Sequence, residues 1–242
     1  TTKGVVGYDL TRLLIGSEGT LAIITEAVLK LTPLAETKRT LRAIYQDIQT
    51  ASQAVAAIMA QATTPCALEF IDHAALDMIR EYSDAELPQQ AGGLLMIEVD
   101  GSASSIDEAI ENIRKAASNE GLLEFTLAQS ADEVAALWAT RKALSPALRK
   151  IAPKKINEDV VVPVASIPRL LEQLEQIEER HHIQIVTFGH AGNGNLHVNL
   201  LIDPKDPDQL AAAEKALDEL FKLTLELNGT LSGEHGVGRV TG

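Results

Sequence analysis

The feature that most restricts the fold of this chain is a short connection between two apolar, strand-like segments. Residues 183–190 (IQIVTFGH) and 196–202 (LHVNLLI) are separated only by the five residues 191–195. A parallel crossover needs a dozen or more residues, so these two strands must pair antiparallel. A wholly parallel, doubly wound sheet is therefore excluded.

Strand-like and helix-like segments alternate along most of the chain. Strands are expected at 39–46, 66–72, 93–100, 122–129 and 155–163, and helices at 51–62, 73–83, 108–118, 135–151, 166–182 and 207–228. Two capping boxes mark helix starts, Ser105 with Glu108 and Ser130 with Glu133. Together with the hairpin, this pattern predicts an α+β fold, a large antiparallel sheet with helices on one face.

The first 35 residues form a separate part of the pattern. Asp9 is an N-cap type of residue ahead of a short helical segment, and residues 16–19 predict a turn. An apolar strand is expected at 21–31, ended by Thr32-Pro33 and followed by the polar stretch LAETK. We therefore place a domain boundary near residue 35.

Composition narrows the classes of function. Of the 242 residues, 21 are basic and 34 acidic, a formal charge of −13, so a basic face for nucleic acid is not expected. No apolar run approaches the ~18 residues of a membrane span, and no secretory signal pattern is present. Cys66 is the only cysteine, which excludes a thiolate metal cluster and fits a reducing, cytoplasmic setting. We expect Cys66 to be a small core residue.

Two histidines flank the hairpin turn. The strand period of two places His197 and Asn199 on one face, opposite a core face made of Leu196, Val198, Leu200 and Ile202. Gly and Asn in the turn AGNGN accept positive φ, so the turn can place His190 beside His197. Two converging imidazoles form half of a zinc-type site. A hairpin with two surface histidines explains the same spacing equally well.

A third ligand is available near the end of the chain. Glu234 and His235 lie between Gly233 and Gly236, in a loop after the last predicted helix. The flanking glycines allow the backbone to approach a ligand closely. Two histidines and a glutamate with an open fourth position form a catalytic rather than a structural arrangement. His235 is then free to act as a general base.

Two motifs carry a resemblance to a known family. FGHAGNGNLHVNL (188–200) together with GEHGVG (233–238) resembles the paired motif of the FAD-linked oxidase C-terminal family, in the vanillyl-alcohol oxidase superfamily. That family includes flavin-dependent D-lactate dehydrogenases, the glycolate oxidase large subunit and D-2-hydroxyglutarate dehydrogenase. DLTRLLIGSEGTLAIITEAVLKLTP (9–33) resembles the end of the preceding FAD-binding domain. The resemblance implies a remnant of that domain over 1–35 and a ferredoxin-like cap, or substrate-binding, domain over 36–242.

The resemblance also implies roles for individual residues. The metal ligands, commonly for zinc, are His190, His197 and Glu234, and the catalytic base is His235. The substrate is held by Arg141, Ser145 and Asn199, and backbone contacts to FAD come from Gly16, Glu18, Gly19 and Ile23. For Arg141 there is a physical reason as well, because a planar guanidinium binds a carboxylate through two parallel hydrogen bonds. Lys154 and Lys155 are left out, since the motifs do not align there without a slip.

The implied reaction is oxidation of a D-2-hydroxy acid, such as lactate, glycolate or 2-hydroxyglutarate, to the 2-oxo acid. Hydride passes to FAD with the help of the metal, and electrons then leave to an acceptor that the sequence does not identify. A homo-oligomer or a partner subunit is expected, with attachment to the membrane surface as an option for the intact enzyme.

Relatives have a long FAD-binding region before this segment and continue beyond GRVTG, so we expect the chain to be part of a longer protein. Alone, it is expected neither to retain FAD nor to turn over substrate. Two other functions stay open, a metal-dependent hydrolase and a non-catalytic module that binds a metal or small acid or docks a subunit.

Overall fold

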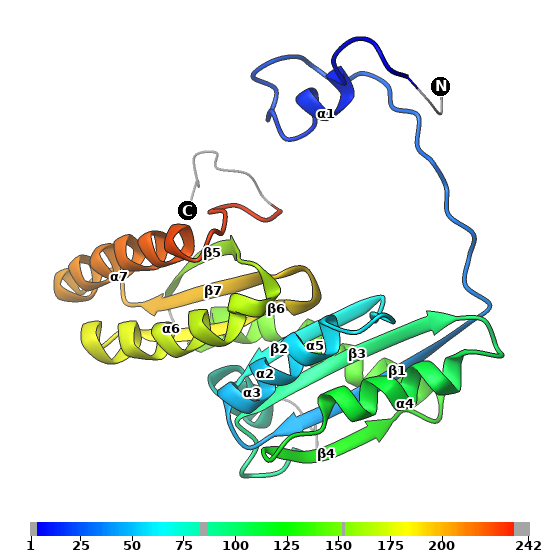
Figure 1. The fold of residues 1–242 in the computed structure, drawn as a ribbon. Helices are drawn as coiled ribbons and strands as arrows, with labels where there is room; N and C mark the ends of the chain where they lie inside the picture. The colour runs from blue at the N-terminus through cyan, green and yellow to red at the C-terminus, as the bar shows by residue number, and fades with distance from the viewer. Residues whose placement is uncertain (1–3, 83–86, 152, 235–242) are drawn as a thin grey trace. The chain divides into compact units, whose positions relative to one another are not determined.

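One antiparallel sheet of seven strands, in the order β4-β1-β3-β2-β6-β7-β5, organises the chain (Figure 1). The computed structural model describes residues 4–82, 87–151 and 153–234. The strands are β1 Thr37–Tyr45, β2 Ala67–Asp72, β3 Gly93–Gly101, β4 Leu122–Leu127, β5 Lys154–Val161, β6 Gln184–His190 and β7 Asn195–Ile202. The first four have the strand order of a ferredoxin-like unit, in which β3 lies between the two strands of a βαβ crossover. The predicted α+β class is confirmed.

Helices cover both faces of the sheet. The covering helices are α2 Ile48–Met59, α3 His73–Tyr82, α4 Ile106–Ala117, α5 Ala131–Ile151, α6 Ile167–His181 and α7 Pro207–Glu226, and short 3₁₀ turns lie at η1 Val164–Ser166 and η2 Ala191–Asn193. A further short helix, α1 Leu10–Leu14, belongs to the N-terminal segment. One core contains side chains of α2, α4, α6 and α7, and a second core on the other face contains side chains of α3 and α5. In the described part of the chain, no helix is both long and apolar enough to cross a membrane.

The expectation that helices cover one face only was therefore wrong. Strand β1 gives the physical reason, because Leu41 and Ala43 enter the first core while Ile44 enters the second. A strand that is apolar on both faces must be covered on both.

Of the two predicted capping boxes, Ser130 does accept from the backbone N of Glu133, at 3.2 Å. Ser105 makes no side-chain cap hydrogen bond.

The β6–β7 hairpin has the predicted antiparallel pairing. Phe188 pairs with His197 and His190 with Asn195, and the turn closes through Gly194 in the left-handed conformation, at φ 76°. The predicted core face of β7 is buried in the first core. His197 and Asn199 consequently project from the opposite face of the sheet. On that face, α3 and α5 pack mainly against strands other than β7.

The two halves of the sheet meet where β2 pairs with β6. Only two residue pairs are in register there, Phe70 with Gly189 and Ile71 with Phe188. The buried carboxylate of Asp72 extends this junction, because it accepts from the backbone N of Ala75 at 2.8 Å and from the backbone N of Thr187. One side chain thus fixes the start of α3 and the position of β6.

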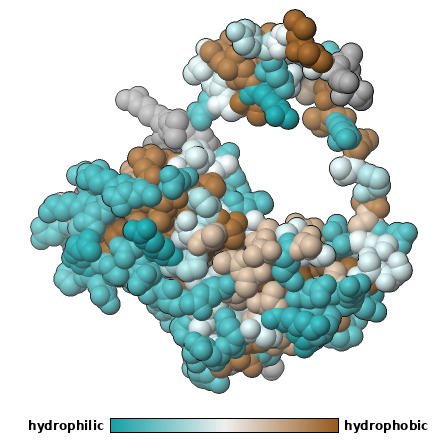
Figure 2. All heavy atoms as spheres, viewed as in Figure 1, coloured by the Kyte–Doolittle hydropathy of each residue, from teal (hydrophilic) through white to brown (hydrophobic). Residues whose placement is uncertain are grey.

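Residues 1–34 form a separate unit that contains α1. The strand predicted at 21–31 is not formed, because no described strand pairs with this segment. Its apolar side chains are exposed, Val28 by 97% and Ile23 by 86%, and Figure 2 shows hydrophobic groups on the surface of this unit. Apolar periodicity marks a segment suited to a sheet, but a strand forms only against a partner edge.

Cys66, which we expected in the core, is exposed.

The hairpin geometry predicts a strong effect of Gly194→Ala. A Cβ on this residue would lie 1.9 Å from the carbonyl oxygen of Val162, and the positive φ adds strain. Such a conformation costs on the order of 1–3 kcal/mol before the overlap is counted. We expect urea unfolding to show at least this loss of unfolding free energy, whereas Asn193→Ala at the exposed neighbouring position stays within about 0.5 kcal/mol of wild type. Equal stability of the two variants would contradict the account.

Candidate metal and carboxylate site

Three potential metal ligands converge at the end of the hairpin. One ligand atom each from His190, His197 and Glu234 lies within 4.8 Å of the other two. The two imidazole rings are 5.5 Å apart between centroids and nearly perpendicular. His190 and Glu234 each have 38% of the side chain exposed, so the point of convergence is open to small molecules. The alternative of two unrelated surface histidines does not describe this geometry.

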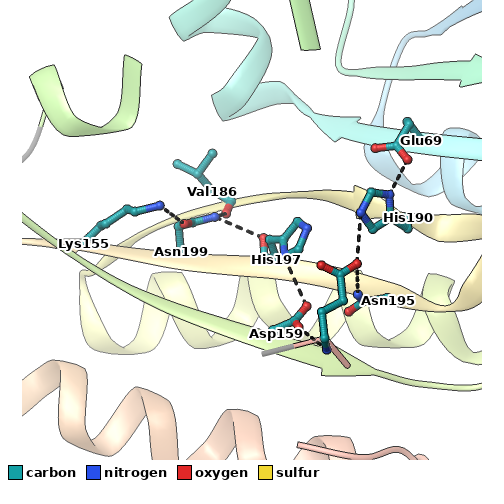
Figure 3. A network of polar contacts seen from close by, with 9 residues as sticks. Glu69, Lys155, Asp159, Val186, His190, Asn195, His197 and Asn199 are labelled. Atoms are coloured by element: carbon teal, nitrogen blue, oxygen red, sulfur yellow. Dashed lines mark hydrogen bonds and ion pairs between the residues drawn. The ribbon is translucent and has the colours of Figure 1, made fainter. Parts of the chain in front are cut away.

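His190 is held between two carboxylates. Its Nδ1 contacts Oε1 of Glu69, and its Nε2 lies 3.1 Å from Oε1 of Glu234. Glu69 comes from the middle of β2 and is 5% exposed. Figure 3 shows it on the side of His190 away from His197. This contact leaves Nε2 as the nitrogen that faces the point of convergence.

His197 has a similar arrangement with a different carboxylate. Its Nδ1 lies 3.2 Å from Oδ1 of Asp159 on β5, the strand residue directly paired with it. Burial lowers the pKa of the His197 imidazole below its ordinary value of 6.5, because the charged form loses its solvation, and nearby Asp159 and Glu234 oppose this shift only in part. The ring is therefore neutral at pH 7, as a metal ligand must be.

Glu234 is held by hydrogen bonds to two residues of the sheet, one on β5 and one on β7. Its backbone N donates to Oδ2 of Asp159 at 2.6 Å, and its Oε1 accepts from Nδ2 of Asn195 at 3.0 Å. A side chain would not fit at the adjacent Gly233, because a Cβ there would lie 2.5 Å from Oδ1 of Asn195. Asp159 thus positions both a histidine and the glutamate of the candidate triad.

Arg141 projects from α5 toward the same face of the sheet. Its Nε donates to Oε2 of Glu69 at 2.8 Å, and its guanidinium lies over the ring of Phe188, 4.8 Å from the centroid. The hydrogen bond to Glu69 therefore uses Nε and not the terminal nitrogens of the guanidinium. Ser145 follows four positions later on α5, but its side chain lies outside what the structure describes.

Asn199 is completely buried, and its amide N donates to the backbone oxygens of Val186 and His197. Its Oδ1 accepts from Nζ of Lys155 at 3.4 Å (Figure 3). The structure therefore brings Lys155, which the sequence analysis left out, to the site face. A direct contact of Asn199 with substrate stays a prediction.

Five predicted residues remain. His235 is outside the described residues. Gly16, Glu18, Gly19 and Ile23 belong to the N-terminal unit, where the first three have positive φ and form the predicted turn after α1.

Sequence reasoning missed Glu69 and Asp159, although each carried a signal. Both are acidic residues inside segments predicted to be strands, CALEFID and KINEDVVV. Acidic side chains are almost never buried without a partner. A charged residue in a predicted buried strand is thus a marker for a polar network, even when its partners are distant in sequence.

Comparison with known proteins agrees with the fold and the motifs. The chain matches the family described as FAD linked oxidases, C-terminal domain, over residues 34–241. It is 41% identical over 238 residues to the glycolate oxidase subunit GlcD of Bacillus subtilis, covering 98% of this chain and 51% of that protein. For GlcD of Escherichia coli the identity is 33%, with 96% and 47% covered. For a probable mitochondrial D-lactate dehydrogenase of Danio rerio it is 29%, with 98% and 48% covered.

The chain belongs to the FAD-linked oxidase C-terminal domain family, and it spans about half the length of these curated relatives. Solved structures support the fold alone. An alkyldihydroxyacetonephosphate synthase superposes with a TM-score of 0.64 at 17% identity, covering 94% of this chain and 46% of that one. A 4-ethylphenol oxidase from Gulosibacter chungangensis gives 0.61 at 15% identity, covering 86% and 47%.

The environment of His197 predicts its titration. In the metal-free chain, NMR of its imidazole is expected to show a midpoint below 6.5, because burial disfavours the charged ring. As pH falls below 6.5, the unfolded chain takes up this proton and the folded chain does not, so His197 lowers the unfolding free energy on the acid side. The same ring in urea-unfolded chain serves as the reference. A folded midpoint at or above the unfolded one would contradict the role of burial.

Proposed function

We propose that this chain is the substrate-binding part of a flavin-dependent oxidoreductase that converts a D-2-hydroxy acid, such as lactate, glycolate or 2-hydroxyglutarate, to the 2-oxo acid. The observation that carries the proposal is the convergence of His190, His197 and Glu234 beside the guanidinium of Arg141. A site for a divalent metal next to a carboxylate-binding group matches the two functional groups of a 2-hydroxy acid. Membership of the FAD-linked oxidase family supports FAD as the electron-accepting cofactor.

The donor set fits a zinc-type ion. Two imidazole nitrogens and one carboxylate oxygen leave a fourth position open, as catalytic zinc sites do. Small side-chain shifts from the present separations, all within 4.8 Å, bring the three atoms to the ~2.0–2.2 Å distances of zinc ligands. A metal bound there would polarise the substrate hydroxyl and lower its pKa.

The other residues bind and orient the acid. Arg141 receives the carboxylate through its terminal nitrogens, which sets the position of the α-carbon. Lys155, held against Asn199, adds positive charge on the same face. His235 is proposed as the base that removes the hydroxyl proton, from its place directly after Glu234. FAD would be held largely by the domain that residues 1–35 would complete, and it would supply the acceptor for the hydride.

The partners follow from the relatives. The two most similar proteins described above are named as subunits of glycolate oxidase, so we propose that this chain also works within an assembly. A membrane-peripheral or cytoplasmic place for that assembly stays part of the proposal.

The direct test of substrate is a panel of D- and L-2-hydroxy acids given to the FAD-loaded enzyme with an artificial electron acceptor. Activity confined to substrates that lack a 2-hydroxy acid would refute the proposal.

Metal binding is the first measurable consequence. Titration of the chain with Zn²⁺ is expected to show one tight site, weakened by at least about 100-fold in His190→Ala and His197→Ala, since each loses a ligand. His73→Ala, which removes an exposed histidine at the start of α3, is the matched control and is expected to bind as wild type does. Loss of affinity in all three variants alike would mean that no specific site exists.

Arg141→Lys tests the carboxylate contact in the FAD-loaded enzyme. An ammonium group cannot reproduce the two-pronged geometry of guanidinium, so kcat/KM for 2-hydroxy acids is expected to fall about ten- to hundredfold. Arg180→Lys, an arginine on α6 that pairs with Glu219 on the surface, is the control and should retain wild-type kinetics. Unchanged kinetics of Arg141→Lys across several acids would remove this residue from the site.

A further inference from the structure

Glu69 joins the two halves of the candidate site. Its side chain is 6% exposed, and its two oxygens have different partners. Oε1 contacts Nδ1 of His190, and Oε2 accepts from Nε of Arg141 at 2.8 Å. The first partner is a proposed metal ligand and the second a proposed substrate ligand, so one carboxylate is bonded to both.

These contacts determine which atoms remain available. A carboxylate only accepts hydrogen bonds, so the hydrogen bond to Glu69 requires the proton of a neutral His190 ring on Nδ1, whereas Oε1 of Glu234, 3.1 Å from Nε2, competes for a proton on Nε2 when no metal lies between them. On Arg141, the hydrogen bond to Glu69 uses Nε, so the two terminal nitrogens are left for other ligands. The ring of Phe188 beneath the guanidinium, at 4.8 Å, restricts its plane.

Core packing does not explain a carboxylate at this position. The neighbouring residues Leu68 and Phe70 fill the first core, and Ile71 on the same face as Glu69 belongs to the second. Burying a carboxylate removes it from water at a cost that only well-placed partners offset. Both partners of Glu69 in the described residues belong to the candidate site.

We propose that Glu69 is a positioning residue, which holds His190 in the tautomer that binds metal and holds Arg141 with its terminal nitrogens toward the substrate carboxylate. This inference rests on the proposed function. It adds a residue from β2, on the other half of the sheet, to a site whose metal ligands come from the β6–β7 hairpin and the loop at Glu234. Hydrogen bonds from metal-ligating histidines to carboxylates have this role in many metal sites.

Glu69→Gln discriminates this role from simple packing. Glutamine has the same shape but one acceptor oxygen, and its NH₂ group must face one of the two donors. It therefore cannot satisfy both His190 and Arg141. Glu98→Gln is the matched control, because Glu98 is also a buried carboxylate, on the adjacent strand β3, and accepts from Lys38, Thr40 and Trp138 instead.

Two readouts apply to the chain, neither of them catalytic. Titration with Co²⁺, followed by its visible absorption, is expected to show affinity about 10–100-fold weaker in Glu69→Gln and unchanged in Glu98→Gln. Long-range ¹⁵N–¹H NMR of metal-free chain at pH 8 is expected to show a larger share of the Nδ1–H tautomer of His190 in wild type and in Glu98→Gln than in Glu69→Gln. In Glu69→Gln we expect a mixture with the Nε2–H form. Thermal unfolding verifies that each variant is folded.

The outcomes separate the two proposals. If wild type binds no Co²⁺, the metal site of the proposed function is wrong, and this inference with it. If wild type binds and Glu69→Gln keeps both its affinity and its tautomer, the inference alone is overturned. Should Glu69→Gln fail to fold, the same two measurements are made on Glu69→Asp, whose carboxylate keeps two acceptor oxygens but is one methylene shorter and so cannot reach both partners in the same geometry. Weakened affinity with a partial loss of the Nδ1–H tautomer supports the inference, and wild-type behaviour overturns it.

Discussion

The pairing of β2 with β6 is the constraint on which the rest of the molecule depends. Two residue pairs and the Asp72 carboxylate join a ferredoxin-like half-sheet to a three-stranded one. A slip of one residue in this register would turn Glu69 to the opposite face, into the core that Leu68 and Phe70 fill. The contact between Glu69 and His190 exists only in the observed register, so the junction and the site are specified together.

The site also explains why one face of the second half-sheet is polar. Residues on β5 and β7 that project toward α5 include Lys155, Asp159, His197 and Asn199, whereas the other face of the two strands buries Val160, Leu196, Val198 and Leu200. Helices α3 and α5 supply the second core over the remaining strands. A sheet that is buried on one face and open at one end of the other can present rigid, closely spaced side chains to a ligand, which loops alone do less accurately.

Local patterns were sufficient for most of the fold. Each predicted strand beyond residue 35 is present, because alternation and turn residues act within a few positions, and the short β6–β7 connection fixed the direction of pairing. Local patterns also placed His190 and His197 on one face. They did not reveal Glu69, which contacts His190 across 121 positions of sequence, nor the failure of 21–31 to form a strand. The first depends on a partner that is distant in sequence. The second depends on a neighbouring strand, and no described strand pairs with 21–31.

Charge finally links the metal to the acid. Among the described residues at the site, the carboxylates of Glu69, Asp159 and Glu234 face the cations of Arg141 and Lys155, and His197 is held neutral by burial. Taken alone, these five side chains sum to a formal charge of about −1, which opposes the attraction of Arg141 for an anionic substrate. A divalent cation on the two histidines and Glu234 reverses the sign, so that a carboxylate is attracted rather than excluded. In the proposed function the metal therefore strengthens the binding of the acid as well as activating its hydroxyl.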